Sequence, residues 1–181
     1  AWGESDGLAF AHRDGDPYGD VVNLARISAN ADDSYVFLLG PALVQNEGWI
    51  DVRGSDRGHV GLGAGGEVRF RIVENDDGDM VRRFIVDKAT AQALVENSAG
   101  AKIDAEGAPD GVVLLGAAGL KELRQSVVNQ QGVVWAKRME IKGGDSGTVV
   151  LGGDLSNISN WDMEIEAAGE RIAIESDDGQ T

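Results

Sequence analysis

Two carboxylates, Asp51 and Asp104, hold equivalent places in a recurring sequence pattern and are the first candidates for chemistry, with Glu166 as a looser third. Asp51, Asp104 and Glu166 each follow directly after an isoleucine in a short apolar run. Polysaccharide-cleaving enzymes use clustered carboxylates of this kind as acid and base. In a chain with 31 acidic and 16 basic residues, however, outward sheet positions are often acidic without any catalytic role. We therefore expect surface carboxylates and no enzyme, with a polysaccharide-acting enzyme as a lesser alternative.

Acidic turns are the second candidate, because carboxylate oxygens are ligands that Ca²⁺ prefers. These turns are Asp14-Gly15-Asp16, residues 75–79 and residues 177–179. None completes an EF-hand loop, since the last ligand position counted from Asp77 is Lys88 in place of a glutamate. We expect solvated turns and no cofactor, with weak Ca²⁺ binding at the turns as the alternative.

Histidines and glycine-rich segments carry little further chemistry. His12 and His59 lie far apart and the chain has no cysteine, so neither a zinc site nor a disulfide is predicted. Residues 61–66 are glycine-rich like a nucleotide-binding loop, but a strand-like segment follows them where that chemistry needs a helix N-terminus. We interpret these glycines as a turn.

Tryptophans could stack on sugars or serve in ordinary packing. Trp135 follows Val134 at the position where other units carry an outward Ser28, Asp51 or Asp104. Trp135 is therefore the best candidate for a surface contact, for example as a sugar-stacking platform. For the tryptophans as a group we favour packing, because large rings are often partly buried for their area alone.

A repeat of short strands must position these residues. Each unit opens with aliphatic residues and an asparagine, and ends with a Val/Leu-rich strand and a glycine. Repeats of this length are typical of an all-β solenoid whose layers stack strand on strand. An asparagine that recurs in register can hydrogen-bond to the asparagine of the next layer, so we favour a structural ladder over isolated turn residues. The predicted ladder is Asn23, Asn46, Asn97, Asn129 and Asn160.

Stacked layers should also align similar aliphatic side chains in columns. One predicted column is Ile27, Ile50, Ile103 and Val134. The second predicted column is Val36, Val60, Val113 and Val149.

The repeat also suggests how the chain is divided. We expect residues 1–20 to be a loop-rich lead-in or coil edge, and residues 21–181 to form one segment of about five to six coils. Strands within residues 67–86 would make an extra coil. Residues 87–94 and 117–125 contain alanine, leucine and lysine in place of β-branched residues, which predicts short helical insertions.

Charge and hydropathy argue against two classes of partner. The net charge of −15 repels phosphates and anionic lipid headgroups, so we expect no nucleic-acid binding. The chain has no apolar run of about 18 residues, so membrane insertion is not expected either. The 26 glycines against 3 prolines favour many short strands joined by glycine turns.

The repeat units resemble those of the filamentous haemagglutinin family of exoproteins, which leave the cell by two-partner secretion. The similarity covers roughly residues 19 to 153, with several differing units in a fixed order. It lies in residues 21–23, 43–48, 94–97 and 127–129, and in the strands of residues 36–41 and 113–116. The resemblance implies a right-handed parallel β-helix (β-solenoid) on the surface or in the biofilm matrix of a Gram-negative bacterium.

The resemblance also implies a function. The chain would be a non-enzymatic structural shaft segment of a secreted adhesin, exported through an outer-membrane transporter. The receptor would be a glycan or a protein of the host cell or the matrix. Unpaired strand edges at both ends suggest an alternative, in which the chain is a subunit that self-associates end to end into an extracellular filament.

Overall fold

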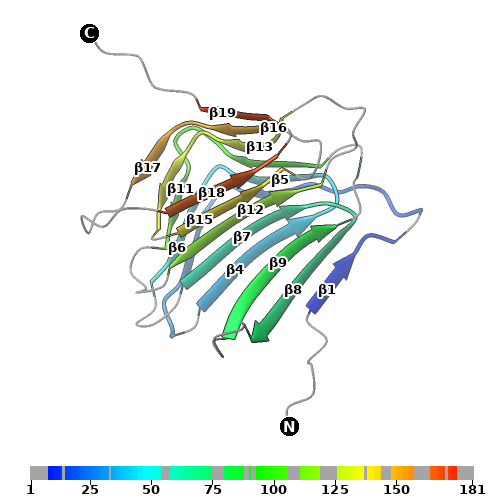
Figure 1. Ribbon diagram of the computed structural model, residues 1–181, viewed down its shortest axis with the longest axis horizontal. Coiled ribbons are helices and arrows are strands. Elements are labelled where there is room, and N and C mark those ends of the chain that lie inside the picture. The colour runs from blue at the N-terminus through cyan, green and yellow to red at the C-terminus, as the bar shows by residue number, and fades with distance from the viewer. Residues whose placement is uncertain are drawn as a thin grey trace.

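The computed structural model describes residues 8–13, 15–32, 34–53, 58–74, 80–87, 90, 93–105, 111–118, 126–136, 138–143, 148–156, 164–169 and 171–174. All regular elements within these residues are β-strands, and none of them is a helix. The strands form four separate sheets (Figure 1). Three sheets contain parallel strands and the fourth is antiparallel.

The first parallel sheet, which we call the amide sheet, has six strands. In the order of their pairing, its strands are β2 (Val21–Asn23), β5 (Leu43–Asn46), β10 (Leu94–Asn97), β13 (Ser126–Gln130), β16 (Thr148–Leu151) and β19 (Arg171–Ile174).

The other two parallel sheets have five strands each. The tryptophan sheet contains β3 (Arg26–Ala29), β6 (Trp49–Val52), β11 (Lys102–Asp104), β14 (Val133–Trp135) and β17 (Asp154–Ser156). The long-strand sheet contains β4 (Ser34–Gly40), β7 (Gly58–Ala64), β12 (Val112–Ala117), β15 (Arg138–Lys142) and β18 (Glu164–Ala168), which cross the front of the molecule in Figure 1.

The chain visits the three parallel sheets in a fixed rotation. It passes from the amide sheet to the tryptophan sheet and then to the long-strand sheet, five times in all, and returns to the amide sheet at β19. Each pass adds one strand to each sheet beside the strand of the pass before. The short strands alternate apolar and polar residues, so one face of each sheet is apolar and turns inward.

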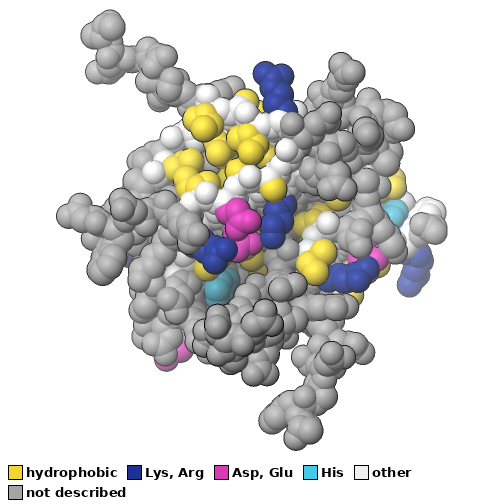
Figure 2. All heavy atoms as spheres, viewed as in Figure 1, with side chains coloured by type: hydrophobic (Ala, Val, Ile, Leu, Met, Phe, Trp, Pro, Cys, Tyr) yellow, Lys and Arg dark blue, Asp and Glu magenta, His cyan; other side chains and the backbone are white. Residues whose placement is uncertain are grey.

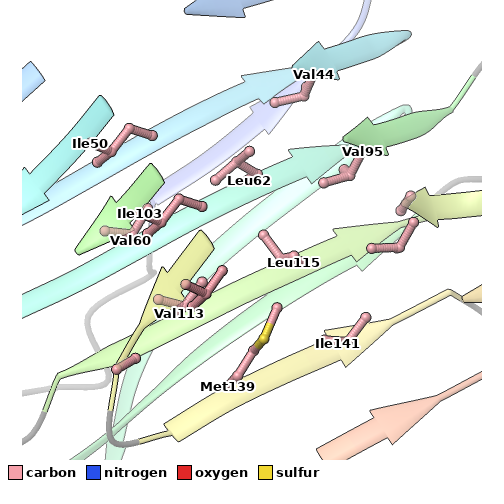
Figure 3. Close-up of a cluster of buried hydrophobic side chains, with 14 of the residues drawn as sticks. Val44, Ile50, Val60, Leu62, Val95, Ile103, Val113, Leu115, Met139 and Ile141 are labelled. Carbon is pink, nitrogen blue, oxygen red and sulfur yellow. The ribbon is translucent and has the colours of Figure 1, made fainter. Parts of the chain in front are cut away.

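One hydrophobic core lies between the three parallel sheets (Figure 3). The amide sheet contributes residues such as Val44, the tryptophan sheet Ile50, and the long-strand sheet Leu62, and all three side chains are fully buried. The first predicted column is confirmed, because Ile27, Ile50, Ile103 and Val134 pair in register across the tryptophan sheet. Similar shapes therefore lie one above another, as close packing requires.

The second predicted column is wrong at its last member. Val36, Val60 and Val113 pair in register, but the next residue in this row is Met139. Val149 lies in the amide sheet, paired with Val128. The strand of residues 138–142 completes the fourth pass, so the Val/Leu strand that follows it opens a new pass instead of closing the fourth.

The antiparallel sheet, which we call the hairpin sheet, packs on the outer face of the long-strand sheet. It consists of β1 (Leu8–Ala11), β8 (Glu67–Glu74) and β9 (Met80–Asp87). Val68 of β8 is buried with Leu114 of β12, and Phe37 and Leu39 pack against them. The prediction that residues 67–86 make an extra coil is therefore wrong, because β8 and β9 pair with each other as an antiparallel hairpin.

The predicted fold class is contradicted. The expectation was one right-handed parallel β-helix with short helical insertions, whereas the described strands belong to four separate sheets of three to six strands, one of them antiparallel. Among the expected helical residues, Asp87 ends β9 and Leu94 begins β10. Thr90 between them is held by hydrogen bonds to the carbonyl oxygens of Ala118 and Pro41, so tertiary contacts outweigh local helix propensity there. Residues 119–125 lie outside the described residues.

Consecutive passes approach each other closely at the corner between the amide sheet and the tryptophan sheet. A Cβ atom on Gly48 would lie 2.1 Å from the carbonyl oxygen of Ala25, in the preceding pass. A Cβ atom added to Gly153 would lie 2.1 Å from the carbonyl oxygen of Gly132. The φ of Gly153, 74°, also favours glycine. Glycine at this corner is thus required by backbone contact between passes.

Gly48→Ala is expected to lower the free energy of unfolding by about 3 kcal/mol, because the new Cβ would collide with backbone that cannot easily move. Chemical denaturation measures the change. Gly19→Ala is the matched control, since no heavy atom lies within 4 Å of an added Cβ there, and its stability should change by less than about 0.5 kcal/mol. Equal stabilities of the two variants would contradict the tight corner.

Candidate functional site

The corner between the amide sheet and the tryptophan sheet contains a row of buried side-chain amides. Asn23, Asn46 and Asn97 end consecutive strands of the amide sheet in register. The Nδ2 of Asn23 donates to the Oδ1 of Asn46 at 2.8 Å, and the Nδ2 of Asn46 donates to the Oδ1 of Asn97 at 2.9 Å. Asn46 is fully buried and also donates to the carbonyl oxygen of Lys102 at 3.3 Å. The row joins three passes of the chain through hydrogen bonds that water cannot reach.

Gln130 takes the next place in this row, and Asn129 lies one residue out of register. Asn97 pairs with Gln130, while Asn129 pairs with Glu96 on the outer face. The longer side chain of Gln130 turns back, and its Nε2 donates to the carbonyl oxygen of Gly132 at 2.9 Å. The Oε1 of Gln130 is buried without a hydrogen-bond partner in the described part of the chain. Asn160 lies outside the described residues.

Two of the three candidate carboxylates meet on the outer face of the tryptophan sheet. Asp51 and Asp104 are paired in register on the neighbouring strands β6 and β11. Both are buried although they point outward, because larger side chains close over them. Glu166 is elsewhere, on β18 in register with Glu140, and is exposed. The structure therefore brings together Asp51 and Asp104 but not Glu166.

Three cations neutralise the two carboxylates. The Nε of Arg53 donates to Asp51 Oδ1 at 2.5 Å, and Arg26 pairs with Asp51 Oδ2. The Nζ of Lys102 lies 3.2 Å from Asp104 Oδ2, and a guanidinium nitrogen of Arg53 lies 3.6 Å from the same oxygen. Arg53 thus contacts both carboxylates. Its positive charge offsets the repulsion between the two negative charges on adjacent strands.

The surroundings of Asp51 set its protonation state. Burial alone would raise the pKa of this carboxyl, but hydrogen bonds and charges from Arg53 and Arg26 outweigh burial and hold the pKa below its usual value. A general acid in glycoside hydrolysis needs the opposite shift, to a raised pKa. Asp51 is therefore suited to a permanent ion pair, and its two oxygens are already engaged by the arginines.

Trp49 and Trp135 lie beside the carboxylates and are covered by the same cations. The guanidinium of Arg26 is 4.0 Å from the ring centroid of Trp49. The Nζ of Lys102 is 4.7 Å from the Trp49 centroid and 3.1 Å from the Trp135 centroid. Both tryptophans are half-buried, and their indole N–H groups are buried without a hydrogen-bond partner among the described residues. Trp135 as a surface contact stays a prediction.

Sequence reasoning missed Arg26, Arg53 and Lys102, although the repeat contained a signal for two of them. Arg26 and Lys102 occupy the same place in their units as Trp49, one residue before the inward isoleucine. Aligning the units therefore stacks arginine, tryptophan and lysine in one row, which is the arrangement observed. Arg53 lies just after β6 and carried no such signal.

The other proposed sites are less defined. His12 stacks on Tyr18 with 4.5 Å between ring centroids, and His59 stacks on Tyr35 at 5.6 Å. No group of three or more His, Cys, Asp or Glu side chains that could hold a metal ion occurs among the described residues. The acidic turns fall largely on residues outside the described set, so Ca²⁺ binding there stays a weak alternative. The described part of the chain contains no helix long and apolar enough to cross a membrane.

Comparison with known proteins does not show a family for this chain. No protein-family model matches it, and no curated protein sequence matches it either. The resemblance to filamentous haemagglutinin exoproteins therefore stays a prediction from the residues of the repeat units. What the structure defines is an all-β protein with three parallel sheets around one core and a hairpin sheet on its outside.

Asn46→Ala is expected to lower the free energy of unfolding by about 3 kcal/mol, because the buried amide groups of Asn23 and Asn97 both lose a partner. Thermal and chemical denaturation measure the loss. The matched control is Gln45→Ala on the outer face of the same strand, where water can replace the hydrogen bond to Ser98, and it should cost about 1 kcal/mol or less. A smaller loss for Asn46 than for Gln45 would contradict the structural role of the row.

Asp51→Asn tests the ion network through its pH dependence. Because the pKa of Asp51 is lowered in the folded state, its contribution to stability is present above the ordinary value of 3.8 and is lost as the pH falls through the folded-state pKa. The variant should be less stable by about 2 kcal/mol at neutral pH. The difference in the free energy of unfolding between the variant and the parent chain should then shrink as the pH falls below 3.8.

Glu166→Gln is the control for this pH dependence, since Glu166 is exposed and its ion pair with Arg138 at 3.4 Å is solvated. Its stability should stay within about 0.5 kcal/mol of the parent chain over the same pH range. A constant difference between the Asp51 variant and the parent across all pH values would mean that the arginines do not hold this carboxylate ionised.

Proposed function

We propose that this chain is a rigid structural segment that holds other parts of an assembly at a fixed separation. The observation that carries the proposal is the continuity of register through the three parallel sheets, from β2–β4 at one end to β17–β19 at the other. Each pass rests on the one before it through backbone hydrogen bonds, aligned core side chains and, in the first three passes, the amide row. Such an arrangement resists bending because any local movement disturbs all three sheets.

The chemistry of the best-defined polar cluster supports a structural role over catalysis. Asp51 and Asp104 are buried under Arg26, Arg53 and Lys102, which engage their oxygens. A carboxylate whose pKa is lowered by fixed arginines is a poor proton donor at neutral pH. The cluster instead links strands β3, β6 and β11, together with the segment after β6, across the outer face of the tryptophan sheet.

The place of such a segment in the cell is a further part of the proposal. A rigid segment of this kind would serve as the shaft of a secreted surface or biofilm-matrix adhesin. This part of the proposal rests on the resemblance of residues 19 to 153 to exported exoproteins. An outer-membrane transporter would then be a transient partner during export. A glycan or protein receptor would be bound by another part of the assembly or by an outer face of this segment.

Distance measurements between the two ends test the rigidity. The chain has no cysteine, so Leu24→Cys and Ala168→Cys place two spin labels on exposed residues of the first and last passes. The labelled chain is mixed with an excess of unlabelled parent chain, so that labels on two associated copies do not contribute a distance. Pulsed electron paramagnetic resonance should then give one narrow distance distribution, no wider than the label itself allows. A broad or multiple distribution in a folded sample would overturn the proposal of a rigid spacer.

Activity measurements test the alternative of a polysaccharide-acting enzyme. The purified chain, incubated with a panel of neutral and acidic polysaccharides, should release no new reducing ends. Cleavage that disappears in both Asp51→Asn and Asp104→Asn, but persists in the exposed control Glu166→Gln, would replace the structural proposal with a catalytic one.

A further inference from the structure

Among the described residues, large hydrophobic side chains are exposed mainly at the two ends of the parallel sheets. On the first pass Leu24 is 72% exposed, and Val22 is 42% exposed. On the last strands Ile174 is 80% exposed and Ile172 is 45% exposed, with Ile165 at 40%. Single exposed apolar residues are common, but clusters at both open ends of one core indicate contact surfaces.

The C-terminal edge exposes residues that belong to the core rows. Ile165, Ile172 and Ile174 are in register with Met139, Val149 and Leu151, all of which are buried. Within the described residues, β17, β18 and β19 are the last strands of their sheets, so no described strand covers these three side chains. Figure 2 shows hydrophobic side chains gathered over β18 and β19, where this edge reaches the surface.

The N-terminal edge offers the matching surface. Within the described residues, its strands β2, β3 and β4 each have a paired neighbour on one side only. Val21 and Ile27 face the core but are only half-buried. The backbone nitrogen of Glu47 donates to the carbonyl oxygen of Asn23, so the backbone of Asn23 faces β5, and that of the adjacent Val22 faces the open edge.

A second copy placed one step beyond β19 continues every sheet with parallel strands in the same order. In the register used throughout the interior, Val21 of the added copy would lie over Ile172, Ile27 over Leu155, and Val36 over Ile165. These three pairs place apolar residues against apolar residues in all three sheets, while Ile174 would lie over Asn23.

Charge at the two edges favours the same pairing. The N-terminal edge strands carry one charged residue, Arg26. The C-terminal edge strands carry Asp154, Glu164 and Glu166 against a single Arg171. By sequence, the N-terminal edge strands are thus net positive and the C-terminal edge strands net negative, which favours their association.

We propose that the N-terminal edge (β2, β3 and β4) of one copy docks on the C-terminal edge (β19, β17 and β18) of a second copy, head to tail. The contact joins two different surfaces and leaves one of each free, so it can extend into a chain of copies. This inference goes beyond the rigid spacer, which needs no self-association. The two proposals can therefore fail independently. The chain could fail the distance test and still associate, or it could remain monomeric and still be rigid.

Sedimentation velocity over a hundredfold range of concentration tests the docking. The parent chain should shift from monomer to dimer and larger species as concentration rises. Val22→Pro removes the backbone N–H at the open N-terminal edge, and Val22→Thr is its control because it keeps the N–H and a β-branched side chain. Ile172→Glu puts a charge where Val21 of the docked copy would pack, and Ala99→Glu is its control in an exposed turn of the third pass, away from both edges.

The two blocked variants give the sharpest result when they are mixed. Each should be monomeric alone, because one of its two edges is disabled, while each retains the other edge. An equimolar mixture should form a dimer and nothing larger, and both controls should associate like the parent chain. A folded parent chain that stays monomeric throughout, association that both edge variants leave unchanged, or a mixture of folded variants that forms no dimer would overturn the proposal.

Discussion

The alignment of consecutive passes at one corner is the constraint on which the rest of the structure depends. In parallel sheets a slip of one residue would turn every inward side chain outward. Asn23, Asn46 and Asn97 oppose such a slip, because their amides can bond to one another only when the strands are in register. Gly48 adds a steric condition at the same corner, since the passes touch through backbone atoms there. With the register fixed, the core rows follow.

The outer face of the tryptophan sheet shows what this register imposes on the polar residues. Stacking equivalent positions places the carboxylates of Asp51 and Asp104 on adjacent strands, where they would repel each other. Arg53 lies between them, and Arg26 and Lys102 complete the neutralisation while lying over Trp49. The carboxylate pair that most resembled a catalytic site thus follows from the repeat. Equivalent positions of two units carry Asp51 and Asp104, and nearby cations offset their negative charge.

Much of the strand arrangement was predictable from the sequence, and the errors have physical causes. Alternation and the recurring isoleucines predicted the row of Ile27, Ile50 and Ile103, because aligned side chains pack best when their shapes match. The separation into four sheets was not predictable from alternation, which is the same in a continuous or a divided sheet. Asn129 and Gln130 are adjacent amides, so only the observed pairing decides which of them faces inward. Helix propensity misled at Asp87, which ends a strand of the hairpin sheet.

Hydrogen–deuterium exchange under native conditions measures most directly whether the three parallel sheets form one cooperative unit. If the corner register holds all of them together, the slowest backbone amides of β5, β6 and β7, and of β10, β11 and β12, should open with the same free energy as global unfolding. Exchange of one sheet at a much lower free energy, while the other two stay protected, would contradict the account.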